Sequence, residues 1–319
     1  MQRSETEMGD QTFDWCYAVG TLCVAAGRLR GRDEGTAEET ERLVRKMKKP
    51  KSDICAYLLL ILGFWIFTFV TLNFWLKPYS IAYEQTGMLT VGYLAYAVIG
   101  MVFSTPAPFL SVLILALFRE KIGLKAFFQR MLQTENKRKT VLLTASFCLA
   151  ALLFALLCGT PIGSPWYMLP LGFLVMIPFV GIAEEAGWRG FLQPKLEKRI
   201  PFPFSVLIVA AIWDVWHIDL WLDPTSNHFG DSFIGFSINI LVWAFALAAL
   251  YKATKSVLAC AVYHAFIDAI GAVYDWNALF DPFPGGIAVN LYRALILTCS
   301  VLLWLRADRQ NRRNGWSER

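Results

Sequence analysis

Several apolar runs in this chain reach 18 or more residues, enough helix to cross a hydrocarbon core of roughly 30 Å. Inside lipid a backbone must satisfy its own hydrogen bonds, so segments of this length are expected to be helices. Hydrophobic residues make up 56% of the sequence, more than is usual in a soluble domain. The sequence therefore predicts an all-α, polytopic transmembrane helical bundle. About eight spans are expected, near residues 54–76, 88–118, 140–160, 167–183, 203–221, 232–251, 256–276 and 287–306.

Basic residues are concentrated in alternate connections between these segments. They gather before the first span and after the second, fourth, sixth and eighth. The opposite connections hold Lys77 alone, and the stretches 219–231 and 275–286 are acidic. Because cytoplasmic loops carry the excess of lysine and arginine, both termini are predicted to be cytoplasmic. This alternation accounts for the net charge of +5, so no nucleic-acid partner is expected. In a bacterium the membrane would be the plasma membrane.

Three regions are expected along the chain. Residues 1–53 are predicted to be a charged cytoplasmic extension, 54–306 the transmembrane domain and 307–319 a basic cytoplasmic tail. The mildly apolar stretch 12–27 follows acidic residues, which makes it a poor signal peptide. Met47, close to the first span, is an alternative start of the chain.

Two adjacent glutamates and an arginine interrupt the fourth span, in the pattern Glu184-Glu185-x-x-x-Arg189. A charged side chain at the centre of a bilayer costs about 2.5 kcal/mol or more, so such residues indicate function. On a helix Glu185 and Arg189 stand at i, i+4 and can neutralise each other. Glu184 points about 100° away from that pair. It is therefore predicted to have another partner.

Two further polar patterns lie on later spans: Trp213 with His217 on the fifth, and His264 with Asp268 on the seventh. At about 1.5 Å per helical residue, Glu184, His217, His264 and Asp268 all fall in the central part of the bilayer. Polar groups at one depth on three helices are expected to face a cavity inside the bundle.

Other polar residues receive structural interpretations. His228, in an outer acidic loop, is expected at the surface. Arg293, near the outer end of the last span, is expected to extend its charged end toward the interface. Asp214, one turn before His217, is a further carboxylate at membrane depth without an assigned role.

A carboxylate beside imidazoles can hold a water molecule, take its proton and return it to a leaving group. The same residues also permit other interpretations. A glutamate–arginine pair can be a structural clamp, and a single histidine on an apolar face is often part of the packing. Polar groups at one depth also suit the proton relay of a transporter. The residues alone leave these alternatives open.

The order of these motifs resembles the CPBP family, the CAAX-protease and bacteriocin-processing family (also called ABI) of glutamate-dependent intramembrane proteases. The likeness covers about residues 140–276, which would be the catalytic core, and includes the run EEAGWRGFLQ from Glu184. The resemblance implies that Glu184 and His217 activate a water molecule. It further implies that Glu185 and Arg189 support the first motif, and that His264 and Asp268 stabilise the tetrahedral intermediate.

The chain departs from the better-studied family pattern at two positions. Position 268 is Asp rather than Asn, and an ionised Asp only accepts hydrogen bonds, so it is expected to orient His264 instead of donating to an oxyanion. Trp213 replaces the commoner Phe. Two carboxylates and two histidines can also bind zinc. The resemblance implies a reaction without a metal, so no cofactor is expected.

The predicted function is thus that of an intramembrane CAAX-type endopeptidase. Its partners would be the lipid bilayer and a peptide or membrane-protein substrate. In the prenyl-protein branch of the family the substrate carries a prenyl group, whereas in a bacterium a bacteriocin-type or other membrane peptide is the better expectation. The alternative from another class is a non-catalytic membrane protein, either a proton-coupled transporter or a bacteriocin-immunity or scaffold protein. The chain shows no inverted repeat of the kind that transporters often have.

Overall fold

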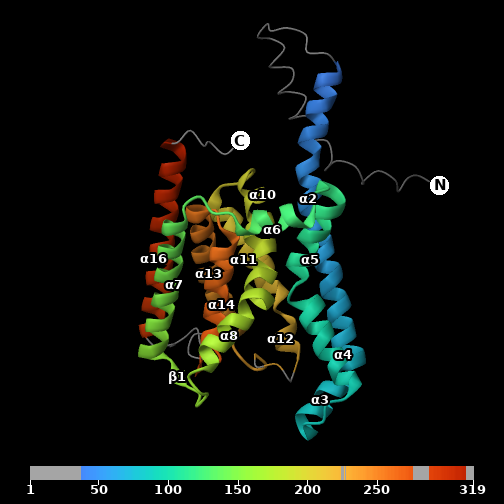
Figure 1. Ribbon diagram of the computed structural model, residues 1–319, viewed down its shortest axis with the longest axis vertical. Coiled ribbons are helices and arrows are strands. Elements are labelled where there is room, and N and C mark those ends of the chain that lie inside the picture. Colours follow the sequence, from blue (N-terminus) through green and yellow to red (C-terminus); the bar gives the residue numbers. More distant parts are fainter. Residues whose placement is uncertain (1–36, 224–225, 227, 276–286, 314–319) are drawn as a thin grey trace, which may run out of the picture. The chain divides into compact units, whose positions relative to one another are not determined.

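The computed structural model describes residues 37–223, 226, 228–275 and 287–313, with side chains from Asp53 onward apart from position 312. Two compact units are distinguished, Met1–Pro50 and Lys51–Arg319. The described part of the first unit is the beginning of helix α2 (Ala37–Val70). The second unit holds every other described helix and strand (Figure 1).

The first helices of the second unit form a long helical segment followed by a bent pair of helices. They are the end of α2, η1 (Thr71–Leu76), α3 (Lys77–Thr86), α4 (Val91–Ile99), η2 (Gly100–Ser104), α5 (Ala107–Ile114) and η3 (Leu115–Glu120), where η marks a π-helical segment. The returning pair is bent by 54° at a break that contains Pro106. Proline has no N–H to donate and its ring clashes with the preceding turn, which explains the bend.

The remaining elements carry the polar motifs. They are α6 (Leu124–Leu132), α7 (Lys137–Cys158), β1 (Thr160–Pro161), α8 (Met168–Met176), η4 (Ile177–Ile182), α9 (Ala183–Gly187), η5 (Trp188–Leu192), α10 (Gln193–Glu197), α11 (Phe202–Trp216), α12 (Asp219–Leu222), α13 (Phe233–Thr254), α14 (Val257–Ile270), β2 (Tyr274–Asp275) and α16 (Ile287–Arg313). The segments α8 to α10 follow one another as a single helical stretch, Met168–Glu197.

Polar side chains cap the N-termini of three of these helices. Asn136, Ser232 and Ser256 accept a hydrogen bond from a backbone N–H in the first turn of α7, α13 and α14, respectively. Such caps satisfy N–H groups that have no partner within the helix. The two short strands β1 and β2 pair in antiparallel fashion, Thr160 opposite Asp275. This pair ties the end of α7 to the end of α14.

The prediction of a multi-pass α-helical membrane protein is confirmed, but the count of eight spans is not. Among the described residues, six helices are long and apolar enough to cross a membrane, or up to seven if the bent α4–α5 pair is one span. The predicted span 256–276 contains α14, which has 14 residues. At 1.5 Å per residue it is about 21 Å long, shorter than the hydrocarbon core.

The core of the second unit is built around α13 and α14. In the most apolar 18-residue stretch of α13, 61% of the residues are buried, against 22% to 33% in the corresponding stretches of the other candidate spans. α13 packs against α11, α14 and α16, and α14 packs against α7, α8 and η4. Large apolar side chains on the outside, such as Phe74, Phe118 and Leu157, are exposed, as expected of a lipid-facing surface.

Arg293 corrects one expectation from the sequence. Its side chain does not extend to the interface; the residue is only 6% exposed. Its Nε donates to Asn239 Oδ1 of α13 at 2.9 Å, and one guanidinium nitrogen donates to Asn290 Oδ1 at 3.2 Å. The prediction failed because the face of α16 that carries Arg293 packs on α13 instead of facing lipid.

Several predictions fall outside the described residues or are not tested by them. Most of the extension 1–53, the residues 276–286 of one acidic connection and the end of the tail 307–319 lie outside the described part of the chain. The limits of the three regions and the cytoplasmic position of both termini stay predictions.

Candidate active site

Glu184 and Glu185 lie in a short α-helical turn between two π-helical segments. They belong to α9, with η4 before it and η5 after it. The proline of η4, Pro178, lacks the N–H that a regular helix would use. π-helical turns change the phase of the side chains that follow and are frequent at functional sites. The direction in which the two carboxylates face is therefore set locally.

Two glycines allow other helices to approach closely beside this turn. A Cβ atom on Gly181 would overlap the backbone carbonyl of Ala261 in α14, and one on Gly187 would overlap the hydroxyl of Tyr57 in α2. Since glycine has no Cβ, both contacts exist without strain. The turn that carries the glutamate pair thus packs closely on α14, on α5 and on Tyr57 of α2.

Glu185 is the centre of a buried polar cluster. Its Oε1 accepts a hydrogen bond from a guanidinium nitrogen of Arg189 at 2.9 Å, and another from His264 Nδ1 of α14, also at 2.9 Å. The side chains of Glu185 and Arg189 are both 0% exposed. The i, i+4 contact expected from the sequence is therefore present, and His264 joins it.

Arg189 connects this cluster to two further helices. A second guanidinium nitrogen donates to the carbonyl of Ala244 in α13 at 3.4 Å. The guanidinium carbon lies 5.2 Å from the ring centroid of Trp213 in α11, a distance typical of a cation–π interaction. The buried positive charge is thus surrounded by a carboxylate, a carbonyl and an aromatic face.

Glu184 stands apart from that cluster although it is the adjacent residue. It is 3% exposed, and its Oε2 accepts a hydrogen bond from the indole nitrogen of Trp188 at 3.3 Å. This is the divergence expected of neighbouring residues on a helix. The carboxylate of Glu184 borders a cavity, whereas Glu185 and Arg189 lie behind the cavity wall.

His217 follows the last residue of α11. Its Nδ1 lies 2.8 Å from the carbonyl oxygen of Trp213, one turn earlier. Because a carbonyl can only accept, Nδ1 carries the hydrogen and Nε2 is the acceptor of the neutral ring. The sequence motif Trp213-x-x-x-His217 thus fixes the tautomer through its own backbone.

His264 and Asp268 are one turn apart on α14. Asp268 Oδ2 lies 3.7 Å from His264 Nε2, while His264 Nδ1 is bound to Glu185. The side chain of Asp268 is 35% exposed and that of His264 only 6%, although both residues line the cavity. The two ring nitrogens of His264 therefore face a carboxylate each.

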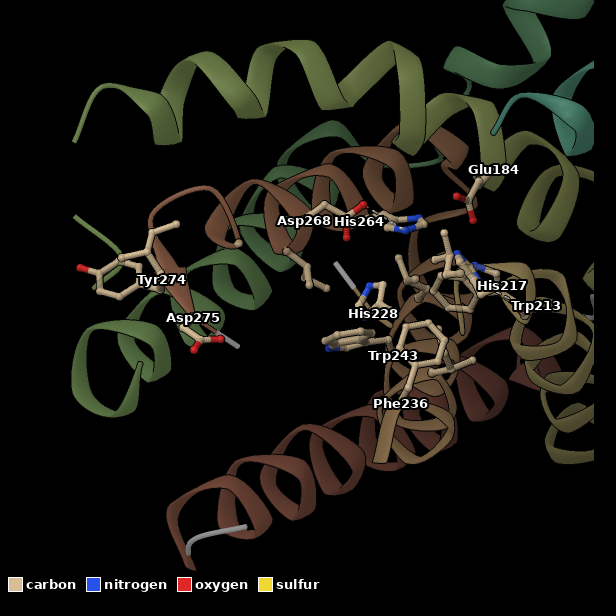
Figure 2. Close-up of a pocket in the computed structure, with 16 residues that line it drawn as sticks. Glu184, Trp213, His217, His228, Phe236, Trp243, His264, Asp268, Tyr274 and Asp275 are labelled. Carbon is tan, nitrogen blue, oxygen red and sulfur yellow. Dashed lines mark hydrogen bonds and ion pairs between the residues drawn. The ribbon is translucent and has the colours of Figure 1, made fainter. Parts of the chain in front are cut away.

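All four residues predicted to meet at membrane depth line one cavity of about 530 Å³, namely Glu184, His217, His264 and Asp268. Figure 2 shows Glu184, His217 and His264 toward one end of this cavity, and Tyr274 and Asp275 toward the other. Among the described residues no direct hydrogen bond joins Glu184 to His217. The two side chains approach the same space from different helices.

Trp213, from the same sequence motif as His217, also lines the cavity. The rest of the wall was not predicted and consists of Ile162, Leu220, His228, Phe236, Ile240, Trp243, Leu247, Ile267, Gly271, Tyr274 and Asp275.

His228 was expected at the surface, and that expectation was wrong: its ring stacks on Trp221 at 5.1 Å between centroids and lines the cavity. Asp231 lies against Trp221, whose indole nitrogen donates to the Asp231 carbonyl at 2.8 Å, so His228 is folded back onto the cavity. No periodic sequence signal reveals such a fold-back.

Asp214, the carboxylate without an assigned role, contacts a neighbouring helix. Asp214 Oδ2 accepts from the hydroxyl of Ser237 at 2.8 Å, so this carboxylate links α11 to α13 and does not line the cavity. Within the part of the chain that the structure describes, no three His, Cys, Asp or Glu side chains are grouped so that they could hold a metal ion.

Comparison with known proteins gives a family match for this part of the chain. Residues 165–270 match the family described as type II CAAX prenyl endopeptidase Rce1-like. The matched segment includes all six residues predicted for the site and the helices from α8 to α14. It confirms the resemblance to CAAX-type proteases. Among curated proteins, no match to the chain was found.

Proposed function

We propose that this multi-pass membrane protein is an intramembrane endopeptidase that hydrolyses a peptide bond with a water molecule activated by Glu184 and His217. One observation carries the proposal: polar side chains from three separate segments of the bundle line a single cavity. The family match to residues 165–270 supports peptide hydrolysis over a transport or scaffold role.

The first step is attack of water on the carbonyl carbon of the scissile bond. Glu184 Oε1, which does not take part in the bond to Trp188, is free to take a proton from the water. His217 Nε2 accepts the second hydrogen and so orients the oxygen, since Nδ1 is held by the Trp213 carbonyl. The C–N bond then breaks, and the proton taken from water passes to the leaving amine.

Negative charge that develops on the carbonyl oxygen needs a donor fixed in advance. His264 fits this role because Glu185 holds its Nδ1 and leaves Nε2 at the cavity. Asp268, when ionised, cannot donate, but at 3.7 Å it favours a proton on His264 Nε2. In this proposal Glu185, Arg189 and Asp268 keep His264 in the donating state and orientation.

The cavity wall suggests the class of substrate. Phe236, Ile240 and Trp243 of α13 give the cavity an apolar and aromatic wall, and the ring of Phe236 lies 5.4 Å from the ring of His217. Such a surface fits an extended membrane peptide with apolar side chains. The family's description makes a peptide with a prenylated cysteine near its C-terminus the first class to test. A bacteriocin-type peptide without a prenyl group is the second.

The test uses purified protein in lipid nanodiscs. Wild type and Glu184→Ala would be incubated with membrane-peptide libraries, with and without a farnesylated cysteine, and the products identified by mass spectrometry. We expect new peptide termini with the wild type only. A matched control, Asp214→Asn, removes a carboxylate at similar depth that does not line the cavity, and it should cleave as the wild type does.

Two results would overturn the proposed function. One is equal cleavage by the wild type and Glu184→Ala. The other is no new terminus from any library together with Glu184-dependent ion or peptide flux in the same nanodisc lipids, which would identify a transporter.

A further inference from the structure

From Glu185 to the end of its helical stretch, every fourth residue is polar: Glu185, Arg189, Gln193 and Glu197. Residues four apart lie on one face of a helix, so these side chains form a row. Glu185, Arg189 and Gln193 are 0% exposed. The proposed mechanism uses only the first two members. The buried remainder of the row has no role in it.

Hydrogen bonds extend the row at both ends. His264 Nδ1 and Arg189 donate to Glu185, as described above. At the other end Gln193 Nε2 donates to Glu197 Oε1 at 2.7 Å, and Lys252 Nζ of α13 donates to Glu197 Oε2 at 2.8 Å. Between them, Arg189 Nε and Gln193 Oε1, a donor and an acceptor one turn apart, have no partner in the described structure.

The contacts of this row with α13 repeat in a fixed register. Arg189 bonds the carbonyl of Ala244, and Glu197 bonds Lys252; in both pairs the partners are 55 positions apart in the chain. The two contacts are therefore eight residues apart on each helix, which is about 12 Å. The two helical stretches thus run in the same direction and are joined at two levels, with the same sequence spacing on each.

Burial of these charges is not explained by stability alone. A buried ion pair often contributes no more than a well-packed apolar pair of the same volume, because both ions lose their hydration. In some proteins such pairs are retained because they select one arrangement among several of similar energy. Here η4 and η5 interrupt the regular helix on both sides of the glutamates, so helix geometry alone does not fix which way the two carboxylates face. Contacts with a neighbouring helix can select one arrangement.

We propose that Gln193, Glu197 and Lys252 are positioning residues that fix the register of the glutamate-bearing helix against α13. We call the contacts Arg189–Ala244 and Glu197–Lys252, together with Gln193 between them, the register clamp. The clamp holds Glu185 where it binds His264, and it holds Glu184 toward the cavity. The predicted effect on catalysis rests on the proposed function, whereas the fixed register of the two helices is independent of it.

The first test measures hydrolysis by Glu197→Gln, Lys252→Met and the exchange Glu197→Lys/Lys252→Glu. Since small misplacement of reacting groups costs up to about 10²-fold, we expect each single variant to lower kcat at least about tenfold with KM within about threefold. The exchange variant, which restores the ion pair with reversed charges, should recover most of kcat.

The matched control is Lys195→Met. Lys195 is on the same short helix, α10, and also forms an ion pair, with Asp53 of α2 at 3.0 Å, but it does not belong to the row. We expect this variant to keep the kcat of the wild type. If Glu197→Gln and Lys252→Met behave like Lys195→Met, or if the exchange variant is as impaired as the single ones, the clamp is overturned.

A second measurement needs no substrate. The chain holds three histidines, so ¹⁵N-histidine labelling gives a spectrum in which His264 can be assigned with a His264→Gln reference. We expect the ring-nitrogen shifts of His264 to change in Glu197→Gln and Lys252→Met but not in Lys195→Met. Shifted His264 signals without any hydrolysis by the wild type would support the clamp and refute the proposed function. Unchanged signals would refute the clamp whatever the enzyme does.

Discussion

His217 differs from the other two histidines of the cavity in what its ring nitrogens contact. Its Nδ1 is bound to a backbone carbonyl, which leaves Nε2 as an acceptor toward the cavity. His264 is bound to two carboxylates, and His228 stacks on Trp221 and contacts Asp231. At the scale of single residues, the three rings therefore differ in the chemistry open to them, and only His217 and His264 take part in the proposed reaction.

This difference gives a prediction for His217→Gln. Loss of the group that orients the attacking water should lower kcat by about 10²–10⁴-fold with KM little changed. His228→Gln, at the same cavity but without a place in the mechanism, should lower kcat less than about tenfold. Steady-state kinetics on a cleaved peptide measures both. Similar losses in the two variants would remove His217 from the mechanism.

The Glu185–Arg189 pair gives a second prediction, about stability. Arg189→Met leaves a fully buried carboxylate without its guanidinium partner, which should cost about 3–5 kcal/mol of unfolding free energy. The double variant Glu185→Leu/Arg189→Met removes both charges and should lose clearly less than the sum of the single variants. Unfolding in detergent, followed by tryptophan fluorescence, measures these differences. Additive losses would mean that the two side chains do not depend on each other.

Contacts between residues close in the sequence could be predicted, whereas contacts between distant segments could not. Glu185 with Arg189, and His264 with Asp268, are one helical turn apart, so their closeness follows from helix periodicity. The contact between His264 and Glu185 joins two helices 79 positions apart in the chain and is not encoded in any local pattern. His228 and Arg293 were misplaced for the same reason, since their surroundings come from a folded-back loop and a neighbouring helix.

At the scale of helices, close approach between η4 and α14 brings His264 to Glu185. Gly181 is the point of contact, because a side chain there would overlap the backbone of Ala261. Gly181→Ala should therefore separate these helices, lower stability by about 1–3 kcal/mol and reduce hydrolysis.

Gly172 is a matched control on the adjoining α8. A Cβ there would meet only the methyl carbons of Ala272 and Ala269, at 3.9 and 4.0 Å, which is ordinary contact. Gly172→Ala should be neutral or stabilising by about 0.4–1 kcal/mol. Thermal unfolding and peptide cleavage of the two variants, compared side by side, test the close approach. Equal tolerance of alanine at both positions would contradict it.

The helices themselves were largely predictable, and their irregularities were not. Long apolar runs bounded by charged connections mark where helices begin and end. The π-helical turns around Glu184 depend on hydrogen-bond phase, which apolar composition does not specify. The short length of α14 was also hidden, because the apolar run 256–276 continues past the end of the helix at Ile270. The row from Glu185 to Glu197 was readable as a four-residue repeat, but its partner Lys252 was not.

At the scale of the whole molecule, the alternation of basic connections predicts the orientation in the membrane. Glu84 belongs to a connection predicted to be outside and Lys137 to one predicted to be cytoplasmic, and both side chains are exposed. In a cysteine-free background, Glu84→Cys should react with an impermeant maleimide on intact cells. Lys137→Cys should react only after the membrane is opened. The reverse pattern would invert the predicted topology.

Composition was sufficient to predict a helical membrane bundle, and motif order was sufficient to predict where its polar centre lies. They indicate a cavity at that centre but not its apolar wall, because Phe236 and Trp243 belong to an apolar helix with no distinguishing pattern. Substrate class depends on that wall and therefore could not be read from the motifs. The central claim, that Glu184 activates a water molecule in this cavity, concerns the molecule as a whole because it requires several helices to meet.

The most direct test of that claim is a single-turnover cleavage in H₂¹⁸O, with enzyme in excess over a peptide identified as a substrate. With the wild type, we expect one ¹⁸O atom in the new carboxylate from the first turnover, because the oxygen comes from water. Glu184→Gln should give no product under the same conditions. An undiminished product yield from Glu184→Gln would contradict the account, as would first-turnover product that carries only ¹⁶O, because the attacking oxygen would then come from the protein.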